Sequence, residues 1–137
     1  MANEATLMWE TELPIPFTCA DGTGIEKGTL LELSDPMTVA AHSNEEGTFG
    51  GIAAEEKIAN DGHTKISVYR AGIFKLTAKG AITVGNALAL SDTANKVKAA
   101  DATCVGADII GVALETAADG ETFMAEIRPG FNNNAYA

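Results

Sequence analysis

The sequence has few of the residues that build disulfide frameworks, metal sites or membrane spans. Its 137 residues include two cysteines, Cys19 and Cys104, and two histidines, His42 and His63. The cysteines lie far apart and form no CxxC pair, so they indicate neither a zinc site nor a disulfide framework. No window approaches a membrane span, and the first residues lack the basic start and apolar run of a signal peptide. We therefore expect a protein kept in a reducing cytoplasm, with no membrane partner.

Basic residues are also scarce. The chain carries 9 Lys and Arg against 19 Asp and Glu, which gives a net charge of −10. Most of the excess lies before residue 61, where eleven acids face only Lys27 and Lys57. A surface of this sign repels phosphate backbones, so we expect no nucleic-acid partner, and solubility is the simplest reason for the charge.

Aromatic residues make up only 6% of the sequence, although 46% of it is hydrophobic. The core is therefore expected to consist of small and β-branched side chains. With 14 Gly and 4 Pro, frequent turns are expected, and these favour many short strands over long helices. A chain of this length corresponds to one ordinary domain.

The longest β-patterned stretch runs from Lys65 to Asp92. In its first half, alternate residues are apolar and belong to one face of an extended chain: Ile66, Val68, Phe74 and Leu76. Gly72 interrupts this run on the apolar face. A glycine at such a place predicts a bulge or sharp bend, where a strand leaves one sheet edge for another.

The second half of the chain repeats the first. A group of five residues recurs 57 positions later: Gly28, Leu31, Leu33, Ser34 and Asp35 become Gly85, Leu88, Leu90, Ser91 and Asp92. Farther on, Gly51-Ile52-Ala53 recurs as Gly111-Val112-Ala113, and Arg70 and Gly72 recur as Arg128 and Gly130. We interpret residues of about 25–72 and 82–130 as two copies of one unit. Because each copy is small for a stable core, we expect both to pack into one mainly β, pseudo-symmetric β-barrel or β-sandwich.

The ends of the chain have a different character. Residues 1–17 are expected to form an extended N-terminal arm, because Pro14 and Pro16 exclude a helix there. Residues 18–130 then form the single β domain, and residues 131–137 form a C-terminal tail. Within the domain, the pattern of residues 53–58 fits either a helical turn or a strand.

Two interpretations of the arm are open. Its only tryptophan, Trp9, either packs into the domain's own core, or the arm lies on a neighbouring subunit and adds main-chain hydrogen bonds at a sheet edge. On the second interpretation, the candidate capsid or subunit interface consists of the apolar residues Leu7, Trp9, Leu13, Ile15 and Phe17.

Catalytic patterns are missing from the sequence. It has no HExxH, GxSxG, calcium-loop or phosphate-loop motif, so we assign no catalytic residue, no metal ligand and no cofactor. Both histidines lie in polar, turn-like segments, where a solvated side chain is the usual state. The alternative is a metal-binding or ligand-binding β-domain, or an enzyme, that uses the His42 and His63 loops with nearby acids such as Glu45, Glu46 and Asp61. Cys104, among small apolar residues, is interpreted as a buried thiol.

Several segments resemble the bacteriophage capsid cement, or head decoration, proteins. The resemblance rests on residues 68–74 (VYRAGIF), 81–85 (AITVG), 88–92 (LALSD) with Lys96-Val97, 110–115 (IGVALE) and Asp119-Gly120, and it covers about residues 65–130. It implies a structural protein, not an enzyme, which binds the major capsid protein on the outer surface of the virion after assembly in the host cytoplasm. It also implies a homotrimer that stabilises the phage head.

Overall fold

The computed structural model describes residues 2–104 and 106–130. The tail expected at residues 131–137 lies outside the described residues. The described chain is built almost wholly of strands, and its one short helix is the 3-10 turn η1 (Gly106–Asp108). The mainly β fold predicted from the alternating pattern and the frequent glycines is confirmed.

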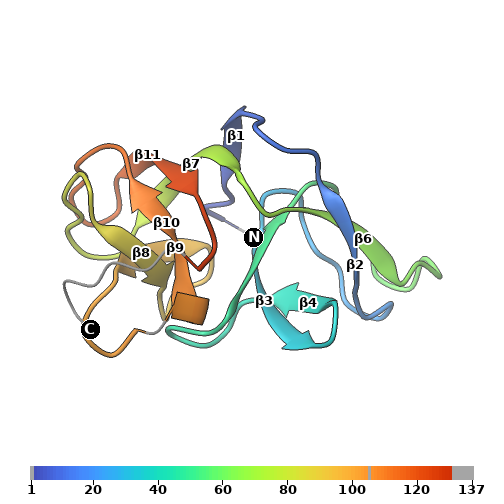
Figure 1. The fold of residues 1–137 in the computed structure, drawn as a ribbon. Coiled ribbons are helices and arrows are strands. Elements are labelled where there is room, and N and C mark those ends of the chain that lie inside the picture. Colours follow the sequence, from blue (N-terminus) through green and yellow to red (C-terminus); the bar gives the residue numbers. More distant parts are fainter. Residues whose placement is uncertain (1, 105, 131–137) are drawn as a thin grey trace.

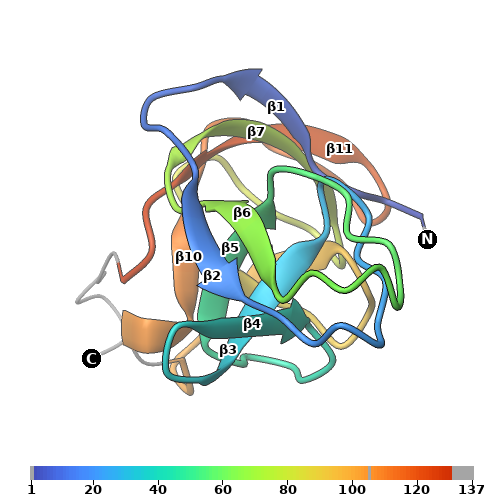
Figure 2. The same ribbon diagram turned by 90° about the vertical axis from the view of Figure 1, so that its right-hand side faces the viewer.

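The strands close into two small barrels that lie side by side (Figure 1). The first barrel has the strand order β2-β4-β3-β5-β6. Its strands are β2 (Ile15–Thr18), β3 (Leu30–Asp35), β4 (Thr38–Ala41), β5 (Phe49–Ala53) and β6 (Lys65–Tyr69). Figure 2 looks onto this barrel.

The second barrel has the order β7-β11-β10-β8-β9 and closes through a pairing of β9 with β7. Its strands are β7 (Gly72–Ala78), β8 (Ala87–Leu90), β9 (Lys96–Ala99), β10 (Ile109–Ala113) and β11 (Thr122–Ile127). A further strand, β1 (Thr6–Trp9), pairs with residues 73–75 of β7, before the residues 77–78 that pair with β9.

The two barrels have the same topology. Each contains one parallel pair, β2 with β4 and β7 with β9, while all their other pairs are antiparallel. Isolated bridges recur at matching places as well, Ile25 with Lys57 and Ile82 with Ala117. The sequence repeat is therefore also a structural repeat. The expectation of a small β-barrel is confirmed, but each copy closes its own barrel, whereas we expected both copies to share one.

The hydrophobic core extends from one barrel into the other. The first barrel has its own cluster around Phe17, Val39 and Ile66. The cluster of the second barrel also includes Leu30, Phe49 and Ile52 of the first. Apolar surface is thus buried between the barrels as well as inside them, which offsets the small size of each core.

The bend expected at Gly72 is confirmed. β6 ends at Tyr69 in the first barrel and β7 begins at Gly72 in the second, with Ile66, Val68, Phe74 and Leu76 all buried. Gly72 has a φ of 140°, a conformation that L-residues with side chains rarely adopt. The sequence left residues 53–58 open between a helical turn and a strand. In the structure, Ala53 ends β5, residues 54–56 form an irregular bend, and Lys57 forms the isolated bridge to Ile25.

Candidate functional site

The sequence predicts a solvated side chain for His42, but the structure buries it. It is 6% exposed. Its Nε2 atom accepts a hydrogen bond from the backbone N–H of Asn95 in the second barrel. The backbone N–H of His42 donates to the carbonyl oxygen of Leu30. Burial lowers the pKa of the imidazole, and this effect is partly opposed by the carboxylate of Glu32. His42 is therefore a neutral acceptor that joins the two barrels.

His63 is exposed, as expected, and lies 3.2 Å from the Asp61 carboxylate. Within residues 2–104 and 106–130, no hydrogen bond or ion pair joins His63 to His42. Among the described residues, neither histidine belongs to a group of three side chains that could hold a metal ion.

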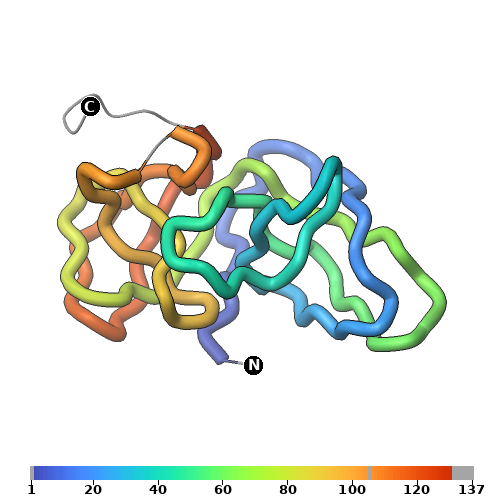
Figure 3. Tube along the Cα trace, turned by 90° about the horizontal axis from the view of Figure 1, so that it is seen from below, coloured from blue at the N-terminus to red at the C-terminus, as the bar shows by residue number. Residues whose placement is uncertain are grey.

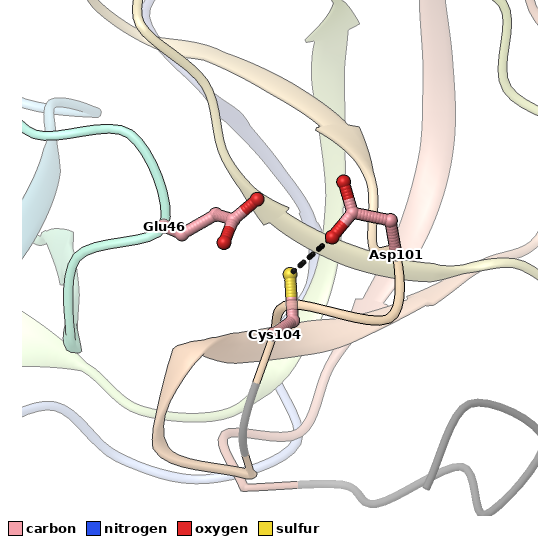
Figure 4. Close-up of side chains that lie close together, drawn as sticks. All are labelled: Glu46, Asp101 and Cys104. Carbon is pink, nitrogen blue, oxygen red and sulfur yellow. Dashed lines mark hydrogen bonds between the residues drawn. The ribbon is translucent and has the colours of Figure 1, made fainter.

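A different cluster has the composition of a cation site. Glu46, Asp101 and Cys104 point toward one another from the β4–β5 loop and the segment after β9, with ligand atoms within 4.8 Å (Figure 4). However, Lys98 already supplies a cation. Its Nζ atom lies 3.0 Å from Glu45 and 3.7 Å from Asp101, and it also donates to Glu46.

Lys98 supplies the one positive charge among the three carboxylates of Glu45, Glu46 and Asp101. Although burial opposes a charge on Lys98, the hydrogen bonds that it donates to the carboxylates of Glu46 and Glu45 hold its pKa above the usual range. Burial raises the pKa of the Cys104 thiol, which disfavours the thiolate that binds metals. The cluster is best described as a polar contact between the barrels. Figure 3 shows the β4–β5 loop reaching toward the second barrel, where the N–H of Glu46 donates to Leu90.

Sequence reasoning missed this contact because its members are far apart along the chain. Lys98 lies 52 residues from Glu46, and Asn95 lies 53 residues from His42. Neither spacing follows a known motif. The adjacent acids Glu45 and Glu46 are a visible signal in the sequence, but they do not indicate Lys98 as their partner.

The candidate interface residues of the N-terminal segment have different environments. Trp9 is 61% exposed and Leu13 is 78% exposed, and Ile15 is also exposed. Leu7 is half-buried against the core, whereas Phe17 is buried within the first barrel. The expectation that Trp9 packs into the core is wrong, because β1 lies flat on the edge of β7 and turns this side chain outward.

Exposed apolar side chains are concentrated in this segment. Four of the eight large ones in the described chain lie between residues 8 and 15: Met8, Trp9, Leu13 and Ile15. Trp9 also continues a row across the outer face of the second barrel, because it pairs with Ile73, which pairs with Glu126, which pairs with Val112. Ile73 and Val112 are half-buried. We call the exposed apolar side chains of this segment, together with this row, the arm surface.

Taken together, the strands define a duplicated two-barrel protein with exposed apolar side chains along its N-terminal segment. No described helix is long and apolar enough to cross a membrane. The family model described as phage cement protein matches residues 9–129, so the chain belongs to the phage cement protein family. It is a structural protein of the phage head, as the resemblance implied.

A solved structure shares the fold. It is the crystal structure of the head fiber gp8.5 N base in bacteriophage phi29, with a TM-score of 0.57 and 18% sequence identity. The match covers 88% of the present chain and 98% of that chain. A search of curated proteins finds no match.

Proposed function

We propose that this protein binds the outer surface of the assembled phage head, contacts the major capsid protein and stabilises its lattice. The observation that carries the proposal is the arm surface, where Met8, Trp9, Leu13 and Ile15 bring half of the exposed large apolar side chains of the described residues into one short segment. Exposed apolar side chains grouped on one surface are typical of protein interfaces, and tryptophan contributes strongly when it enters a partner's pocket.

The rest of the molecule suits this role. Membership of the phage cement protein family supports a location on the capsid. The net charge of −10 favours solubility before the shell is met. On this proposal the protein is not an enzyme, and it joins the head in the host cytoplasm. Because many copies bind to each shell, modest individual contacts act together through avidity. By the resemblance to decoration proteins, we further propose that it binds as a homotrimer.

The experiment uses phage heads that lack this protein and purified full-length chain. Heads are mixed with the protein, and bound chain is measured after sedimentation. The double substitution Trp9→Ala and Leu13→Ser should weaken binding by about tenfold or more, since losing an anchoring tryptophan typically costs over 2 kcal/mol. Met37→Asn is the matched control, because Met37 is exposed and apolar but lies in the β3–β4 turn.

Two readouts separate binding from stabilisation. Sedimentation reports occupancy, and the temperature at which heads release DNA reports stability of the lattice. If the occupancy of the double variant on heads equals that of the unmodified chain and of the Met37 control, the arm surface is not the contact. If bound protein leaves the release temperature unchanged, the stabilising role is wrong.

A further inference from the structure

Two turns at matching places of the repeat have the same backbone structure. They lie at residues 26–29, before β3, and at residues 83–86, before β8, and we call them the Gly28 turn and the Gly85 turn. The N–H of Gly28 donates to the carbonyl of Ala53, and the N–H of Gly85 donates to that of Ala113, each at 2.8 Å. Both glycines also have a positive φ, 89° and 90°.

In the first barrel, an extended segment covers this turn. The N–H of Ala5, just before β1, donates to the carbonyl oxygen of Gly28 at 2.8 Å. The two backbones lie so close that a Cβ atom on Gly28 would overlap the carbonyl oxygen of Ala5 and touch Glu4. Gly28 is therefore buried. The Gly28 turn is thus a binding site for extended backbone, and the chain's own residues 4–5 fill it.

The second barrel leaves the same turn uncovered. Gly85 is exposed, and a Cβ atom there would meet no other atom within 4 Å. Among residues 2–104 and 106–130, no N–H or O–H donates to its carbonyl oxygen. The backbone acceptor that holds an extended segment on the first barrel is therefore available to another chain on the second.

The side chains around the two turns differ in chemistry. Lys27 lies beside the Gly28 turn, and it lines the same hollow as Glu4 of the covering segment. Val84 stands in its place on the second barrel, and Leu114 follows the carbonyl to which the Gly85 turn is bonded. These two side chains are 56% and 42% exposed. Exposed apolar side chains beside an available backbone acceptor suit an extended segment that carries an apolar residue.

We infer that the Gly85 turn binds an extended segment of the capsid shell protein. One N–H of that segment donates to the carbonyl oxygen of Gly85, as Ala5 donates to Gly28. The residue before it, in the place of Glu4, is apolar and packs on Val84 and Leu114.

The position of the turn favours the shell as the source of the segment. Leu114 lies two residues after Val112, where the row of the arm surface ends, so the turn adjoins that surface. The equivalent segment of a second copy of this chain is already bound to that copy's own Gly28 turn. That the segment comes from the shell rests on the proposed function, whereas the binding of extended apolar backbone does not.

The first test needs no capsid. A peptide amide with the sequence of residues 2–7, in which leucine replaces Glu4, is titrated into the full chain and followed by the NMR shifts of Gly85 and Leu114. Its control has N-methylalanine in the place of Ala5 and so lacks the donor. The unmethylated peptide should bind about fivefold more tightly, which is the effect of one hydrogen bond. Equal binding of both peptides, or no saturable shift at the turn, overturns the site.

A charge substitution tests the apolar wall. The unmodified chain should bind the leucine peptide severalfold more tightly than the peptide that keeps Glu4. Val84→Lys installs the residue found at Lys27, so this variant should prefer the Glu4 peptide. Ile58→Lys adds the same charge at a residue that is 64% exposed on the first barrel, and it should leave the preference unchanged. An unchanged preference in Val84→Lys, or the same reversal in Ile58→Lys, overturns the apolar contact.

The second test uses the heads described above. Val84→Lys and Leu114→Ser should each weaken head binding severalfold at an unchanged melting temperature, because both side chains are exposed, while Ile58→Lys should bind normally. Normal head binding by both turn variants overturns the shell as the source of the segment and leaves the arm surface intact. If the unmodified chain fails to bind heads, the proposed function fails, and the peptide titration alone still decides whether the turn binds extended backbone.

Discussion

The Nε2 atom of His42 accepts a hydrogen bond from the backbone N–H of Asn95, with 2.8 Å between the two nitrogen atoms. The bond connects the end of β4 in the first barrel to the turn before β9 in the second. Because Nε2 is the acceptor, the imidazole must be neutral, and protonation would remove the bond. The contact between the barrels is therefore sensitive to pH.

Acidification should destabilise the protein through His42. Its pKa in the folded state lies below the ordinary value of 6.5, because burial disfavours the charged ring. The unfolded chain thus binds the proton more readily, so this part of the stability is present above pH 6.5 and is lost as the pH falls below it. Denaturant unfolding between pH 5.5 and about 7.5 measures it.

The control for this pH effect is His42→Gln, which retains an acceptor but cannot titrate. Its stability should change less over the same range than that of the unmodified chain. The lowered carboxyl pKa values of Glu46 and Asp92 act at lower pH and do not interfere. Parallel pH profiles for both proteins would contradict the role assigned to His42.

Asn95 should be a second determinant of the barrel contact. Its Oδ1 atom accepts from the N–H of Leu30 at 3.0 Å, and its Nδ2 atom donates to the carbonyl of Ala2. Asn95→Gly keeps the positive φ of 61° but leaves the buried N–H of Leu30 unpaired, so we expect a loss of about 1–3 kcal/mol in unfolding free energy. Asn60→Gly, at an exposed residue with a φ of 63°, should change it by less than about 0.5 kcal/mol. Similar losses in the two variants would assign the effect to the backbone.

Gly111 should not tolerate a side chain. A Cβ atom there would overlap the carbonyl oxygen of Glu126, because β10 passes very close to β11. We expect Gly111→Ala to destabilise the protein by about 1–3 kcal/mol or more in thermal or denaturant unfolding. Gly106→Ala adds the same methyl group at a distance of 3.9 Å from the carbonyl oxygen of Gly130, and it should be nearly neutral. A tolerated Gly111→Ala would mean that the strands can separate.

The Lys98 cluster should not respond to metal ions in the unmodified protein. Added calcium or zinc, or a chelator, should leave the melting temperature unchanged, because the ammonium already lies among Glu45, Glu46 and Asp101. Lys98→Met removes that charge, so this variant should melt at a lower temperature and regain part of the loss in calcium. A metal-induced shift in the unmodified protein would contradict this description.

Removal of residues 2–17 should unfold the first barrel, although we expected these residues to form a separate arm. The deletion takes away most of β2, which pairs with β6, and the buried Phe17. We expect the truncated protein to lose cooperative unfolding, which circular dichroism measures during heating. The substitutions Trp9→Ala and Leu13→Ser change only exposed side chains and should leave the melting curve almost unchanged, so they are the suitable test of the arm surface.

Local patterns along the chain were enough to establish the strands and the duplication. The alternation of Ile66, Val68, Phe74 and Leu76 specifies one buried face, since successive side chains in a strand point to opposite sides. The glycine of Gly51-Ile52-Ala53 recurs in Gly111-Val112-Ala113 because both Gly51 and Gly111 lie where the next strand passes too close for a Cβ atom. These constraints act between near neighbours or recur at matching places, so they are visible in the residues themselves.

The tertiary structure alone decided that each copy closes its own barrel, that His42 is buried, and that Lys98 occupies the acidic cluster. Closure depends on the parallel contacts of β2 with β4 and β7 with β9, each between strands about twenty residues apart along the chain. His42 and Lys98 owe their environments to partners more than fifty residues away. Contacts over such separations are set by the packing of one barrel against the other, which no local periodicity encodes.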